Sequence, residues 1–288
     1  MKERGVLFGE PKGLLGILTE PAAAPPADRP AVVFLNAGLV HRVGPHRMSV
    51  RLARALAEAG YLALRFDLSG VGDSEPRRDA LSYAERALLD VKQAVDFLAQ
   101  SRGVRRVVSV GLCSGADNSY WAALRDPRIA GVVSLDGFAY RTPRFYARYY
   151  GPKVLRPASW RTLGKKALGL ARKRLDKALG SSGGSASGAP EQAEKVPAYV
   201  REFPPKAEYA AGLATLAQRG ARLLLLYSAG MHEYYNYEGQ LWDAFPAPEL
   251  RDAVTTRFFA GANHTFTELA FQDRLTEVVT AWVRSTFP

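Results

Sequence analysis

Hydrophobic and polar positions form two kinds of segment that alternate along the chain. Continuous apolar runs typical of strands buried on both faces recur, and stretches with helical spacing lie between them. The predicted strands cover 5–10, 14–21, 31–38, 61–68, 104–111, 129–137, 221–230 and 254–261. The predicted helices cover 47–59, 82–101, 114–126, 205–218 and 268–285. This order predicts an α/β fold with one mostly parallel sheet flanked by helices.

The alternation stops between residues 138 and 204. That segment is aromatic, proline-rich and basic, and it contains a predicted helix at 161–179 and a Gly/Ser tract at 180–190, a composition typical of flexible chain. We therefore expect a core made of 1–137 and 205–288 with an inserted basic lid at 138–204. A chain of 288 residues is long enough for one large domain with such an insertion.

The net charge of +11 is concentrated in the inserted segment. Residues 141–178 contain twelve Lys or Arg and a single acid, Asp176, so they account for the whole excess. The densest part of the predicted basic helix consists of Lys165, Lys166, Arg172, Lys173 and Arg174. Such a field predicts an acidic partner: an acyl carrier protein, the phosphates of coenzyme A, or a membrane surface beside the amphipathic helix. The alternative is a solvated basic surface. Nucleic acid is disfavoured because no nucleic-acid-binding motif accompanies the charge.

Cysteine content and apolar run length predict a cytoplasmic protein. The chain has one cysteine, which excludes an internal disulfide and suits a reducing compartment. No apolar run approaches the roughly 20 residues that span a bilayer. The first 21 residues are broken by Gly, Pro and Glu, unlike the apolar segment of a secretory signal.

The stretch "GLCSG" at 111–115 has the form Gly-x-nucleophile-x-Gly and stands between a predicted strand and a predicted helix. Hydrolases use this turn to expose a nucleophile, and its glycines avoid clashes across the tight turn. The register of the glycines places Cys113 at the apex and makes the backbone N–H of Ser114 an oxyanion donor. The helix N-terminus and a nearby histidine would favour the thiolate. The alternatives are a serine site shifted by one residue and a buried structural cysteine.

Hydrolases with this turn supply nucleophile, acid and histidine in that chain order, each after a strand. His264, in "GANHTFTE", follows the last predicted strand and is the expected base. Glu233 follows strand 221–230 and is the expected acid that orients the imidazole. Glu238 and Asp136 are its rivals.

The loop after strand 31–38 is expected to supply the second oxyanion donor, the backbone N–H of Leu39 or Gly38. Asn36 stands where such loops often begin with histidine. His41, Arg42 and His46 further along either bind substrate or brace the loop. We expect neither a metal nor a cofactor in this site.

Four stretches together resemble the α/β-hydrolase superfamily: "FLNAG", "RFDLSGVGDS" at 65–74, "GLCSGA" and "NHTF". The resemblance covers 1–137 and 205–288, and it implies that 65–74 is a structural loop. The longer stretch 41–74 is also similar to hydrolases associated with exosortase systems.

The chain departs from most of that superfamily by carrying cysteine in place of serine. A Cys-His-acid set is similar to dienelactone hydrolases, polyester synthases and Dieckmann-type cyclases that release acyl chains from carrier proteins. This similarity, with the chemistry of a thiolate, implies an acyl-processing enzyme that forms a thioester on Cys113 from thioester-linked substrates, by transfer, cyclisation or thioesterase-type release. The alternatives are a small ester or lactone hydrolase and a non-catalytic basic scaffold or membrane-associated binding protein.

Overall fold

The structure, a computed structural model, describes residues 1–10, 12–154 and 201–288. The chain divides into two compact units: Met1–Thr142 with Phe203–Pro288, and Pro143–Glu202. The first unit extends beyond the predicted core limits of 137 and 205. The reason is packing, because Phe138 and Ala139 are buried in the core.

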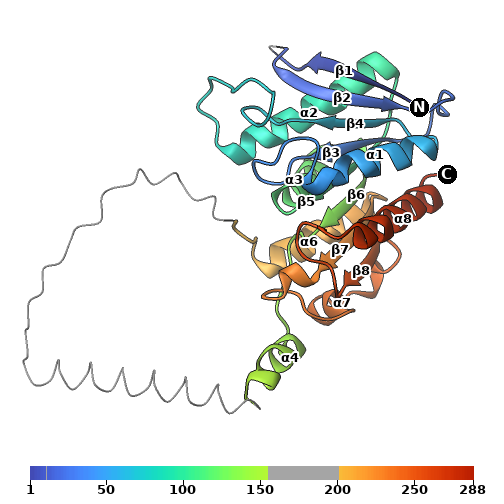
Figure 1. Cartoon of the computed structure of the whole chain (residues 1–288). Coiled ribbons are helices and arrows are strands. Elements are labelled where there is room, and N and C mark those ends of the chain that lie inside the picture. Colours follow the sequence, from blue (N-terminus) through green and yellow to red (C-terminus); the bar gives the residue numbers. More distant parts are fainter. Residues whose placement is uncertain (11, 155–200) are drawn as a thin grey trace, which may run out of the picture. The chain divides into compact units, whose positions relative to one another are not determined.

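Among the described residues, eight strands form one sheet (Figure 1). The strands are β1 (Lys2–Phe8), β2 (Leu14–Glu20), β3 (Ala31–Leu35), β4 (Ala63–Phe66), β5 (Val107–Leu112), β6 (Ile129–Leu135), β7 (Arg222–Ser228) and β8 (Val254–Phe259). Their order across the sheet is β1-β2-β4-β3-β5-β6-β7-β8. β2 pairs antiparallel with both β1 and β4, and every other neighbouring pair is parallel. The predicted α/β class with a mostly parallel sheet is confirmed.

Helices cover both faces of this sheet. The helices of the first unit are α1 (Met48–Glu58), α2 (Tyr83–Arg102), α3 (Ser114–Arg125), α6 (Lys206–Gln218), α7 (Gln240–Ala244) and α8 (Leu269–Thr286). α1 and α8 contact each other and share one apolar cluster with the sheet, whereas α2, α3 and α6 contribute to a second cluster. Two separate apolar clusters explain why central strands such as β3 are buried along their whole length.

Local sequence signals set the helix limits. Met48, Leu52 and Leu56 recur at four-residue spacing on α1 and are buried. α2 begins with a capping box, in which Ser82 and Glu85 each accept a hydrogen bond from the other's backbone N–H. It ends at Gly103, whose φ of 65° suits a residue without Cβ.

The sheet gathers the candidate residues at one edge. β3, β5, β6, β7 and β8 run parallel, so the loops after their carboxyl ends lie at the same edge. Ligand sites of open α/β sheets form at this edge. The described connecting loops also contain three short 3-10 helices that the sequence pattern did not predict: η1 (Pro45–Arg47), η2 (Ala229–Met231) and η3 (Pro248–Leu250).

The second unit contains α4 (Pro143–Val154), a helix in a segment that was expected to be irregular. The rings of Phe145 and Tyr149 stack along it with centroids 5.6 Å apart, as side chains four residues apart on a helix can. The predicted basic helix at 161–179, its five named Lys and Arg residues and the Gly/Ser tract at 180–190 lie outside the described residues. The lid therefore stays a prediction. Within the described ranges, no helix is both long and apolar enough to cross a membrane.

Candidate active site

Cys113 lies at the sharp turn between β5 and α3. Its φ of 56° and ψ of −120° are rare for any residue except glycine, and such strain is concentrated at functional sites. The turn is possible because Gly111 and Gly115 have no side chains. A Cβ on Gly111 would lie 2.1 Å from the Gly115 backbone, and one on Gly115 would lie 2.6 Å from the Asn36 carbonyl oxygen. The cysteine is partly exposed, and it is the N-cap residue of α3.

His264 lies on the loop between β8 and α8, as predicted. Its Nδ1 is 2.7 Å from Oδ2 of Asp136, and the imidazole is also hydrogen-bonded to the thiol of Cys113. Asp136 directly follows β6 and is fully buried, with φ of 50°. The structure therefore brings together a thiol, an imidazole and a carboxylate in the order that nucleophilic catalysis requires.

Glu233 does not take the position expected for the acid. Its side chain is exposed, and its backbone carbonyl accepts a hydrogen bond from Arg141 Nε at 2.8 Å. The other rival, Glu238, accepts the N–H of Phe258 at 2.9 Å. The reason is topology: β6 is the direct neighbour of β5, so its end lies beside the cysteine, whereas η2 separates Glu233 from the end of β7.

The electrostatics of the site favour a charged imidazole. The pKa of His264 is raised to about 10, first by the hydrogen bond to Asp136 and then by the hydrogen bond to Cys113, and partial burial opposes both effects. An imidazolium at neutral pH, next to a thiol at a helix N-terminus, favours the thiolate.

The predicted oxyanion donors have different positions. Ser114 is the first residue of α3, so its N–H has no acceptor within that helix. The N–H of Gly38, however, donates to Ser114 Oγ at 2.7 Å, so this donor is already engaged. Within the described part of the chain, no acceptor is seen for the N–H of Leu39, whose side chain is 81% exposed. Leu39 therefore fits the second donor better than Gly38.

An ionic network holds the loop that carries these donors. Asn36 donates to Asp67 Oδ1 at 3.0 Å and to the Val40 carbonyl at 2.8 Å, and its Oδ1 accepts the Leu68 N–H at 2.8 Å. The Arg42 guanidinium binds the fully buried Asp67. Of the two roles considered for the basic residues here, this geometry supports bracing of the loop.

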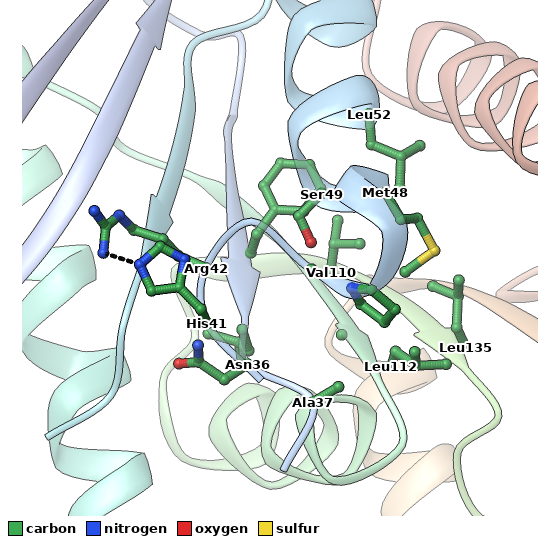
Figure 2. A pocket seen from close by; sticks show the side chains of 15 residues that line it. Asn36, Ala37, His41, Arg42, Met48, Ser49, Leu52, Val110, Leu112 and Leu135 are labelled. Carbon is green, nitrogen blue, oxygen red and sulfur yellow. Dashed lines mark hydrogen bonds between the residues drawn. The ribbon is translucent and has the colours of Figure 1, made fainter. Parts of the chain in front are cut away.

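Figure 2 shows the small cavity behind this loop, with His41, Arg42 and Asn36 on one side. Aliphatic side chains line the opposite side: Met48, Leu52, Val110, Leu112 and Leu135. The cavity has about 20 Å³, room for about one water molecule. Its lining contains neither Cys113 nor His264, so it is not the cavity in which a substrate would meet the thiol.

Ligand atoms of His41, Asp67 and Asp73 lie within 4.8 Å of one another, close enough to hold a metal ion. A guanidinium nitrogen of Arg42 already contacts all three, at 2.7 Å from His41 Nε2 and 2.8 Å from Asp73 Oδ2. Arginine supplies the positive charge at this position, so the cluster is better described as an ion pair than as a metal site.

Comparison with known proteins agrees with this architecture. A family model described as the alpha/beta hydrolase fold matches residues 30–218. No curated protein sequence matches the chain. Similar solved structures include an α/β serine hydrolase homologue from Coxiella burnetii, with 16% identity, a TM-score of 0.56 and coverage of 98% of this chain and 97% of that one.

Two further structures are similar over nearly their whole lengths. One is a Xanthomonas campestris protein described as a serine hydrolase without a lid, with 13% identity, a TM-score of 0.56 and coverage of 100% of this chain and 96% of that one. The other is Est1E from Butyrivibrio proteoclasticus with bound ferulic acid, with 16% identity, a TM-score of 0.56 and 95% coverage of both chains. At such identities the likeness concerns the fold, and the family model covers most of the sequence. The chain belongs to the alpha/beta hydrolase fold family.

Proposed function

We propose that the protein is an acyl-processing enzyme that forms a thioester on Cys113. One observation carries the proposal: His264 is hydrogen-bonded both to Cys113 and to the buried Asp136. Because Asp136, and not the expected Glu233, is bonded to His264, the proposed triad is Cys-His-Asp.

The reaction begins with attack of the Cys113 thiolate on the acyl carbonyl carbon. The resulting oxyanion is stabilised by the N–H groups of Ser114 and Leu39. When the bond to the leaving group breaks, the His264 imidazolium gives its proton to the departing thiolate or alkoxide. The neutral imidazole then takes a proton from water or another acceptor, which attacks the thioester and regenerates the thiolate and the imidazolium.

A cysteine nucleophile favours thioester donors over oxygen esters. Exchange of one thioester for another is close to thermoneutral, whereas forming a thioester from an ester is uphill. A thioester intermediate also reacts well with amines and carbanions, which permits transfer or cyclisation as well as hydrolysis. The competing candidate is hydrolysis of a small ester or lactone, favoured by the esterases among the structural neighbours.

The basic segment supports a partner for this chemistry. Residues 141–178 carry the whole net charge of the chain, which suits an acidic acyl carrier protein or the phosphates of coenzyme A. Neutralising Lys165, Lys166, Arg172, Lys173 and Arg174 together should weaken such binding, and so should raising the salt concentration. Affinity that is equal at low and high salt would argue against carrier docking, and a membrane surface would be tested with anionic vesicles.

Intact-protein mass spectrometry tests the proposal. Incubation with acetyl-coenzyme A, with an acylated carrier protein and with an enol-lactone should show which donor adds an acyl mass. We expect the thioester donors to acylate the wild type and to leave Cys113→Ala unmodified. Turnover of the lactone with no adduct from either thioester would favour the hydrolase, and no reaction with any donor would favour a non-catalytic basic scaffold.

A further inference from the structure

Ser228 is the last residue of β7, and its side chain is fully buried. Its backbone N–H donates to Asp136 Oδ1 at 2.7 Å, and its hydroxyl donates to Asp136 Oδ2 at 2.6 Å. The hydroxyl is the donor in the second bond because a carboxylate oxygen only accepts, and the same hydroxyl accepts the N–H of Gly230 at 3.1 Å. Ser228 therefore contacts both oxygens of the carboxylate that binds His264.

The turn after Ser228 also lies against the histidine loop. A Cβ on Gly230 would be 2.3 Å from the backbone nitrogen of His264, so the two backbones are in direct contact. The Ser228 hydroxyl thus links the carboxylate to the turn that supports the imidazole.

We propose that Ser228 is a positioning residue that holds Asp136 in the geometry needed to keep His264 charged and the Cys113 thiolate formed. The proposal rests on the proposed function of this site. Ser228 is the last residue of β7, the strand after which the sequence analysis expected the acid, Glu233.

Asp136 needs such a partner because it is fully buried and has no contact with water. A buried carboxylate needs donors for both oxygens, and a hydrogen bond to a charged group is worth about twice a neutral one. His264 and the Ser228 hydroxyl share Oδ2, whereas the Ser228 amide holds Oδ1. Without the hydroxyl, the carboxylate is stabilised less as an anion and can turn away from the imidazole.

The single cysteine permits a test that needs no substrate. The rate of alkylation by iodoacetamide, followed against pH, reports the thiolate fraction of Cys113 alone. The titratable groups that interact with the imidazole are Asp136 and Cys113, and Tyr83 of α2 interacts with Cys113, so the profile reports these groups together. The variants are Ser228→Ala, Ser228→Thr, which keeps the hydroxyl, and Asp136→Asn. Ser109→Ala, a buried serine on β5, is the matched control.

We expect Ser228→Ala to slow alkylation at neutral pH by about tenfold and to move the rise in rate to higher pH. Ser228→Thr and Ser109→Ala should behave like the wild type. A wild-type profile in Ser228→Ala, or an equal loss in Ser228→Thr, would overturn the role of the hydroxyl. If Asp136→Asn shifts the profile in that case, the triad stands without Ser228, whereas a profile unchanged by Asp136→Asn as well would overturn the proposed function too.

Discussion

Nδ1 of His264 lies 2.7 Å from Oδ2 of Asp136, a carboxylate at the end of the strand adjacent to that of the cysteine. The same imidazole is also hydrogen-bonded to Cys113. Chain order alone does not say whether Asp136, Glu233 or Glu238 is the acid that binds the histidine, and this contact selects Asp136. Substitutions of the three carboxylates should therefore differ in their effect on activity.

Asp136→Asn should reduce acylation of Cys113 by about a hundredfold or more, because an amide cannot hold the imidazole in the required tautomer or stabilise its charge. Glu233→Gln should stay within about twofold of the wild type, because a change on the exposed surface has little effect. Single-turnover acylation followed by intact mass measures both. Equal losses in the two variants would contradict the assignment of the acid.

The pH dependence of stability should report the histidine. Its folded pKa is raised from 6.5 to about 10, so its stabilising contribution is complete below pH 6.5 and is lost as the pH rises toward 10. The difference in the free energy of unfolding between the wild type and His264→Gln should therefore shrink across that window. Urea titrations at several pH values measure it, and a difference that stays constant from neutral to alkaline pH would contradict a charged imidazole.

Relief of backbone strain at the turn should be measurable. Cys113→Gly and Cys113→Ala both remove the thiol, but only glycine adopts φ of 56° and ψ of −120° without strain. The glycine variant should be the more stable by about 1 kcal/mol after allowing for the greater entropy of its unfolded chain. Chemical denaturation gives the comparison. An alanine variant as stable as the glycine variant would mean that the turn is unstrained.

The ion pair between Arg42 and Asp67, which braces the loop after β3, should contribute strongly to stability. Asp67→Ala leaves the Arg42 guanidinium, only 11% exposed, without its buried partner, and should destabilise the protein by about 3–5 kcal/mol. Glu277→Ala breaks a pair whose side chains are 68% and 67% exposed, and should cost less than about 1 kcal/mol. Thermal unfolding of both variants provides the measurement, and similar losses would exclude a special role for the buried pair.

Elements with a strong period were predictable from the sequence. The continuous apolar runs predicted the parallel strands because both faces of the sheet are covered, and the helix predicted at 82–101 begins within one residue of α2. The turn at Cys113 was predictable in part because Gly111 is required by contact with the Gly115 backbone only four residues away, whereas Gly115 is required by the carbonyl of Asn36 on a distant part of the chain.

The partner of His264 was not predictable in the same way. All carboxyl ends of the parallel strands meet at one edge, so Asp136 and Glu233 satisfy the same local rule. The choice depends on which strand lies beside β5 and on the chain direction after β7, and both are set by long-range packing. The engagement of the Gly38 N–H by Ser114 likewise joins residues far apart in the chain and has no local signal.

The core secures the chain on both sides of residues 143–202. Tyr140 donates to the Pro204 carbonyl at 2.7 Å, and Thr142 lies 2.7 Å from the Tyr237 hydroxyl. Both ends of the core chain that flank this segment are therefore hydrogen-bonded to core residues. A short bridge from Thr142 to Phe203 should therefore give a smaller protein in which Cys113, His264 and Asp136 keep their positions.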